Sequence, residues 1–144
     1  MRSPEITENK FEISENVLEE IKKEVNEPFE WRYFSIEDID FALILSPSKN
    51  EDGTINGTPA EVYGQPGEFA IYIWEDLPEN IQRVLLFHEI VEIYLYKTYH
   101  IENIRDAHLA TLEYEDAFKR GVVSDEEDKQ LKQFRIDYPE SSIS

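Results

Sequence analysis

The sequence contains no cysteine. This absence excludes a disulfide framework, and it excludes every metal site that is built on thiolates. Any metal ligands must therefore be histidine or carboxylate side chains. Because the chain has only three histidines, few imidazole nitrogens are available for that purpose.

Basic residues are scarce as well. The 144 residues include 14 Lys and Arg against 32 Asp and Glu, which gives a formal net charge of −18 at pH 7. Such a charge confers solubility, repels nucleic acid and anionic membranes, and attracts basic partners. We therefore expect no direct binding of nucleic acid, and the sequence leaves the oligomeric state open.

Long hydrophobic runs are also missing. No apolar stretch of the sequence is long enough to cross a membrane. The first residues, "MRSPEITENKFEISENV", lack the apolar core of a signal peptide. We therefore expect a cytoplasmic protein that does not contact membranes.

What is present suits one globular domain. Apolar residues make up 40% of the chain, and eight Phe, eight Tyr and two Trp can fill one core. We expect a single domain over residues 1–144, with loose termini at 1–10 and 139–144.

Hydrophobic periodicity predicts helices at both ends of the chain and strands between them. We expect helices over about 15–26, 78–99 and 101–120, and a short fourth helix that opens at the Ser124/Glu127 capping box. We expect strands over 41–46, 59–64 and 68–74, separated by turn sequences around Asp52-Gly53, Asn56-Gly57 and residues 64–68. The predicted fold class is α+β, with a small antiparallel sheet packed on a helical layer.

The helix predicted at 78–99 carries polar residues inside an apolar sequence. In "LLFHEIVEIYLYKTYH", Glu92 lies about 40° from His88 on a helical wheel, within the apolar stripe. A buried carboxylate needs a partner, and His and Glu one turn apart can bind the same ion. Glu89 points to the flank of that face. This is the arrangement of a zinc-peptidase helix, in which the glutamate takes a proton from water in the open coordination position.

A third ligand is available on the next predicted helix. His108 shares the apolar stripe of that helix, and a short turn at "YHIEN" would fold it back against the first. His88, Glu92 and His108 form the two-His, one-Glu set of catalytic zinc sites, so we expect one divalent ion, zinc. Glu115 lies about 10 Å further along the helix from His108. It could accept a hydrogen bond from the N–H of a metal-bound imidazole, or it could line the cleft.

Other interpretations of these residues stay open. His88 and Glu92 could be a hydrogen-bonded core pair without metal. Two His and one carboxylate are also the ligands of non-haem iron enzymes, although the glutamate between the ligands favours hydrolysis.

The order of these segments resembles a known family. A strand "EFAIYIWEDLP", a helix "ENIQRVLLFHEIVEIYL" and a helix with a further ligand resemble the minimal zincin-type metallopeptidases of the ImmA/IrrE kind, over roughly residues 66–120. That family carries HExxH and a downstream glutamate ligand. His88 matches its first histidine and Glu89 its general base. Glu92 stands where the second histidine would be, so the motif is HExxE, and His108 would supply the missing imidazole.

The resemblance implies a zincin-like core over about 41–120, with the sheet on one side of the HExxE helix. It implies hydrolysis of a peptide bond in an intracellular protein, such as a basic regulatory protein. It also implies that the strand before the helix lines the cleft and pairs by its edge with the substrate peptide. The residues of that edge would be Phe69, Ile71, Tyr72, Ile73 and Trp74.

An acidic binding protein without catalytic activity is the alternative. Such a protein could mimic nucleic acid or regulate a basic partner, and it would use the acid clusters at residues 37–40 and 125–128. A mimic of this kind needs no ion at His88, so metal content distinguishes the two functions.

Overall fold

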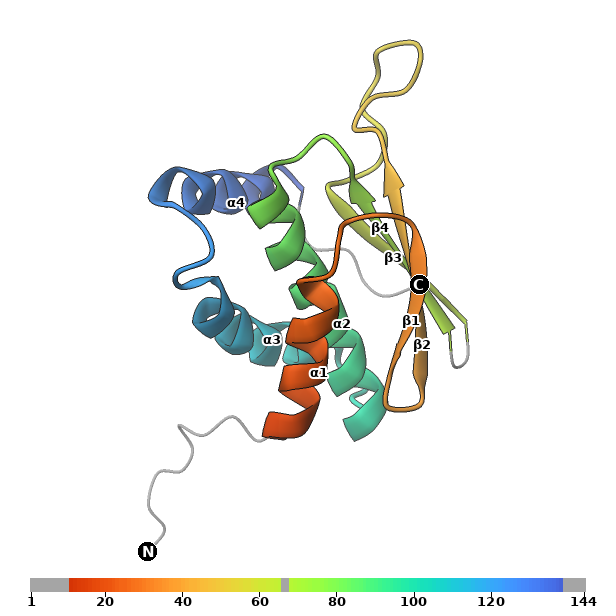
Figure 1. The fold of residues 1–144 in the computed structure, drawn as a ribbon, viewed down its shortest axis with the longest axis vertical. Helices are drawn as coiled ribbons and strands as arrows, with labels where there is room; N and C mark the ends of the chain where they lie inside the picture. The colour runs from red at the N-terminus through yellow and green to blue at the C-terminus, as the bar shows by residue number, and fades with distance from the viewer. Residues whose placement is uncertain (1–10, 66–67, 139–144) are drawn as a thin grey trace, which may run out of the picture.

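The computed structural model describes residues 11–65 and 68–138, and it has the α+β class that the sequence predicts. The predicted loose termini and the middle of the turn at 64–68 lie outside these residues. One sheet lies beside a layer of helices (Figure 1). The elements are α1 (Glu15–Val25), β1 (Arg32–Ile36), β2 (Ile39–Ser46), β3 (Ala60–Gln65), β4 (Glu68–Trp74), α2 (Glu79–Tyr99), α3 (Ile104–Lys119) and α4 (Asp125–Asp137). None of these helices combines the length and apolar character needed to cross a membrane.

The sheet is mixed, so the prediction of an antiparallel sheet is wrong. Its order is β1-β2-β4-β3. β1 pairs antiparallel with β2, and β3 pairs antiparallel with β4, but β2 and β4 run parallel. The reason lies in residues 47–59, which form a long projecting connection with its own Lys49–Ile55 bridge (Figure 1). Because this connection is not a tight hairpin, β3 need not lie beside β2, and β4 takes that place.

The strands predicted from the sequence do not include β1. It has only five residues, "RYFSI", and follows a segment rich in turns and charges. Its buried positions, Phe34 and Ile36, show the alternation of a strand with one face on the core.

The prediction of a substrate-binding edge on the strand before the HExxE helix is also wrong. That strand is β4, and both of its edges are already paired, with β2 and with β3. The side chains of Phe69, Ile71 and Ile73 are buried on the helix-facing side, which fits a central strand. Tyr72 is half-buried and Trp74 is buried. Among the described strands, the free edges belong to β1 and β3.

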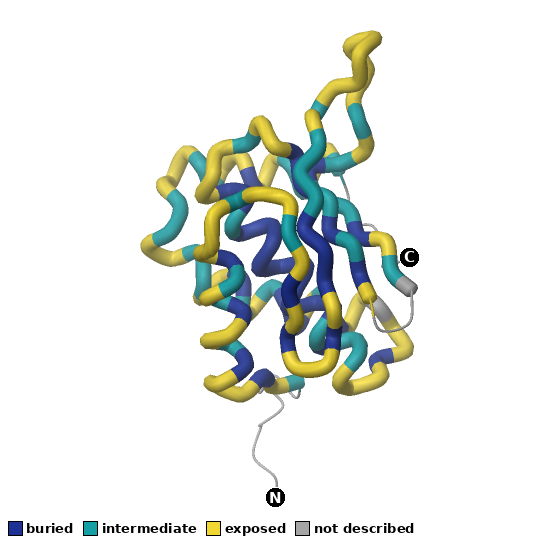
Figure 2. Tube along the Cα trace, turned by 45° about the vertical axis from the view of Figure 1, so that its right-hand side comes forward, coloured by how far each residue is buried: buried dark blue, intermediate teal, exposed yellow. Residues whose placement is uncertain are grey.

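Helix α2 lies at the centre of the molecule. Every residue from 84 to 93 is buried, on all sides of the helix (Figure 2). β3 and β4 contact α2 on one side, and α1, α3 and α4 contact it elsewhere. A helix enclosed in this way must be apolar all round. Its few polar residues are therefore forced to find partners inside the protein.

The helix boundaries agree with the capping signals in the sequence. Ser14 caps α1, and Ser124 and Glu127 form the predicted capping box at the start of α4. α3 begins at residue 104, a few residues later than predicted, because Asn103 is its N-cap. α2 ends at Tyr99, and the left-handed backbone of its C-cap, His100 (φ 51°), turns the chain towards α3.

Candidate metal site

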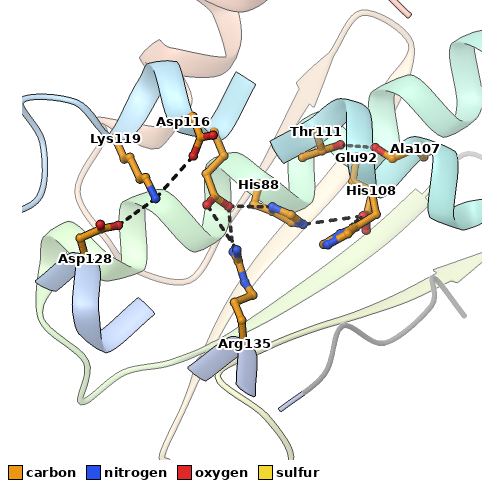
Figure 3. A network of polar contacts seen from close by, with 10 residues as sticks. His88, Glu92, Ala107, His108, Thr111, Asp116, Lys119, Asp128 and Arg135 are labelled. Carbon is orange, nitrogen blue, oxygen red and sulfur yellow. Dashed lines mark hydrogen bonds and ion pairs between the residues drawn. The ribbon is translucent and has the colours of Figure 1, made fainter. Parts of the chain in front are cut away.

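Three side chains from two adjacent helices meet in the interior. His88 and Glu92 come from successive turns of α2, and His108 comes from the second turn of α3. The reversal at His100 brings α3 back against α2. Figure 3 shows the three side chains pointing towards one another. The grouping is the one that the helical spacing predicts.

The distances suit a metal ion. Glu92 Oε2 lies 3.6 Å from His88 Nε2 and 3.0 Å from His108 Nδ1. Each of the three residues offers one ligand atom, and these atoms all lie within 4.8 Å of one another. Tetrahedral zinc, with bonds of about 2.0–2.1 Å, separates its ligand atoms by roughly 3.4 Å. Small side-chain movements would therefore bring the three atoms into one coordination sphere.

The two side chains that α2 contributes to the cluster are buried, and His108 is more exposed. The side chains of His88 and Glu92 are each 1% exposed, whereas that of His108 is 21% exposed. An ion could therefore reach the cluster past His108. Glu92 Oε1 is buried and accepts no hydrogen bond from any residue that the structure describes. A buried carboxylate oxygen with remaining acceptor capacity is what a cation site requires.

The charge of Glu92 is stabilised by its neighbours. Burial by itself would raise the pKa of Glu92, but the hydrogen bond with His108 and the contact with His88 outweigh burial and lower the pKa. His108 donates this hydrogen bond when Nδ1 is protonated. Loss of that proton leaves a nitrogen lone pair next to a carboxylate, which is the state that binds metal.

Glu115 orients His88 from the other side of the ring. Its side chain is 2% exposed, and its Oε1 lies 2.8 Å from His88 Nδ1. Burial would raise the pKa of Glu115, but the hydrogen bond and charge of His88, together with Arg135, lower it to about 2. An ionised Glu115 can only accept, so Nδ1 of His88 carries the proton of this hydrogen bond. In the neutral form of the ring, which is the form that binds metal, the lone pair is then on Nε2 and faces Glu92. Metal-ligating histidines commonly have such a carboxylate partner.

Arg135 is the residue of this network that the sequence reading missed. Its guanidinium donates two hydrogen bonds to Glu115, at 2.8 Å and 3.3 Å, from α4 (Figure 3). α4 is held in place by the Lys119–Asp128 ion pair, at 2.8 Å, and by ring contacts of Phe134 with the sheet. The sequence does hint at this contact, because a buried Glu115 needs a cationic partner and Arg135 directly follows Phe134, which faces inward.

Glu89 and His100 lie outside the ligand cluster. Glu89 is 5% exposed on α2 and is not one of the three clustered ligands. Its predicted place beside the open coordination position stays a prediction. His100 is exposed at the end of α2 and lies outside the cluster, as predicted from its distance along the helix.

No family model, curated protein or solved structure matches this chain. Its function must therefore be inferred from the residues of the cluster and their geometry.

Proposed function

We propose that this protein is a zinc-dependent, metallopeptidase-like hydrolase with a zincin-like arrangement. His88, Glu92 and His108 hold one divalent ion, and Glu89 is the general base. The observation that carries the proposal is the approach of three ligand atoms from two helices to within 4.8 Å of one another. The orientation of His88 by the buried Glu115 supports it further, because metal-ligating histidines commonly donate their other ring N–H to a carboxylate.

The donor set fits zinc. Two neutral imidazoles and one carboxylate leave the bound ion with a net positive charge, and three protein ligands leave one coordination position open. A bound zinc ion supplies Lewis acidity, which polarises a peptide carbonyl and makes water more acidic. Glu92 contributes the single compensating charge, and the two histidines fix its carboxylate in place.

Glu89 performs the proton transfer. As water attacks the peptide carbonyl, the Glu89 carboxylate accepts a proton, and it later delivers that proton to the leaving amine. Positioned acid–base catalysis of this kind contributes roughly 10²–10⁴-fold to the rate. Glu89 is suited to this role because it is buried beside His88 on α2 and is not a member of the ligand cluster.

The substrate is an extended segment of a protein. β3 is a free edge among the described strands, and it packs against α2. A peptide could add to this edge through main-chain hydrogen bonds. The net charge of −18 favours basic substrates, including basic regulatory proteins inside the cell.

Hydrolysis by zinc-loaded protein tests the proposal. The substrate is an unfolded polypeptide rich in Lys and Arg, and the variant is Glu89→Gln, which keeps the shape of the side chain and removes the base. We expect the variant to retain zinc and to lose about 10²–10⁴-fold in turnover. The conservative variant Glu75→Gln, at an exposed position just after β4, is the control. Equal turnover of Glu89→Gln and wild type would overturn the role of Glu89, and loss of zinc from Glu89→Gln would make it a ligand.

A further inference from the structure

A separate hollow lies on the other face of the sheet. Its volume is about 370 Å³, and it is lined by Ser46, Asn56, Thr58, Glu61, Tyr63 and Tyr72. Ile71 and Ile73, on either side of Tyr72 in β4, are fully buried against the helices. Because side chains alternate along a strand, Tyr72 projects to the opposite face. The hollow is therefore separated from the metal cluster by the sheet.

The hollow contains a carboxylate that is held in place. Glu61 Oε1 accepts a hydrogen bond from the Thr58 amide at 2.8 Å, and Oε2 accepts one from the Tyr63 hydroxyl at 2.5 Å. Gly57 has a φ of +64°, and a Cβ at that position would lie 1.9 Å from Glu61 Oε1. The glycine is thus needed for the carboxylate to sit against the loop. A carboxylate has about four acceptor sites, so Glu61 can accept further hydrogen bonds.

Two aromatic rings flank this carboxylate. Tyr63 and Tyr72 meet edge to face, with centroids 5.4 Å apart and planes at 88°. Glu61 and Tyr72 are cross-strand partners, and the side chain of Tyr63 is half exposed. The described residues that line the hollow include no Lys, Arg or His. The hollow thus presents a fixed anion and aromatic faces to solvent.

We propose that this hollow binds the guanidinium group of an arginine side chain from a partner polypeptide. A guanidinium is planar, donates in a fork to a carboxylate and stacks on aromatic rings, so it matches both features of the hollow. The volume is within the range of side-chain and small-ligand pockets. The net charge of −18 attracts such a group from solution. The site does not depend on zinc, because it lies on the opposite face of the sheet.

Peptide titration followed by NMR tests this site in protein kept in EDTA, so that failure of the metal proposal does not affect the result. The probes are acetyl-Gly-Arg-Gly-amide and the same peptide with citrulline, which has the shape of arginine without its charge. We expect the arginine peptide to shift the amide signals of Thr58 and Tyr72, and the citrulline peptide to bind about tenfold more weakly or worse. Equal binding of the two peptides, or shifts confined to other surfaces, would overturn the proposal.

Two variants distinguish the hollow from general attraction to an acidic protein. Glu61→Gln should weaken binding of the arginine peptide about tenfold or more. Asp40→Asn removes the same charge from an exposed position on β2 and should leave binding within about twofold, since screening weakens distant charges. Gly57→Ala keeps every charge but displaces Glu61, so it should also weaken binding. If Glu61→Gln and Asp40→Asn weakened binding of the arginine peptide equally, the hollow would not be a specific site for the guanidinium group. Thermal unfolding of each variant checks that the fold is retained.

Discussion

Glu115 on α3 accepts a hydrogen bond from His88 on α2, with 2.8 Å between Oε1 and Nδ1. The two residues are 27 positions apart in the chain and almost completely buried. Their contact decides which nitrogen of His88 faces Glu92. With Nε2 of His88 directed to Glu92, these two residues can both act as ligands of one metal ion.

Removing the charge of Glu115 should weaken zinc binding. In Glu115→Gln the amide accepts less strongly and can itself donate, so His88 is no longer restricted to one tautomer. We expect zinc affinity to fall about 10–100-fold, the usual cost of losing a partner of a metal-ligating histidine. Competition with a chromophoric chelator measures this affinity. Glu113→Gln, an exposed position on the same helix, is the control. Unchanged affinity in Glu115→Gln would mean that Glu115 does not orient a ligand.

Arg135 should act on the metal site through Glu115. Arg135→Met keeps much of the apolar stem and removes the two hydrogen bonds that Glu115 accepts. We expect a loss of unfolding free energy on the order of 1–3 kcal/mol, because a buried carboxylate loses charged donors. Zinc affinity should fall as well. Urea unfolding and zinc competition measure the two effects. Lys129→Met, at an exposed position on α4, should change neither, and equal behaviour of the two variants would contradict the role of Arg135.

The stability of the metal-free protein should depend on pH in acid. The folded protein holds the pKa of Glu115 at about 2, below its ordinary value of 4.5. A lowered pKa means that the folded state binds fewer protons than the unfolded state. The stability from ionised Glu115 is then complete above about pH 4.5 and is lost as the pH falls towards 2. Glu92 shifts in the same direction.

Urea unfolding in EDTA at a series of pH values measures this loss. Wild type should be more stable than Glu115→Gln at neutral pH, and the difference between the two should shrink as the pH falls below about 4.5. A difference that stays constant down to pH 2 would show that Glu115 is not held ionised by the fold.

The ligand cluster was predictable because it depends on local spacing. His88 and Glu92 are one helical turn apart, and the short connection at His100 can only fold α3 back onto α2. Periodicity and a short turn therefore sufficed to bring His108 to the same place. The position of Glu115 was predictable from the spacing of the same helix, because Glu115 lies near the face that carries His108.

The sheet order was not predictable in this way. Pairing between β2 and β4 joins segments that are far apart in sequence, and it depends on the course of residues 47–59. β1 is too short for its alternation to be distinctive. The contact of Arg135 with Glu115 likewise depends on where α4 docks, which is fixed by contacts such as Phe134 with Trp74 rather than by any local pattern.

Metal content is the most direct test of the central claim that His88, Glu92 and His108 hold one zinc ion. Untagged protein, incubated with zinc and dialysed, is measured by elemental analysis beside His88→Ala, His108→Ala and His100→Asn. The last variant removes a histidine outside the cluster, and asparagine tolerates the left-handed backbone at that position. We predict about one zinc per chain in wild type and His100→Asn, and little in the other two. Folded wild type that retains no zinc would contradict the claim, and it would favour an acidic binding protein whose His88 and Glu92 are core hydrogen-bonding residues.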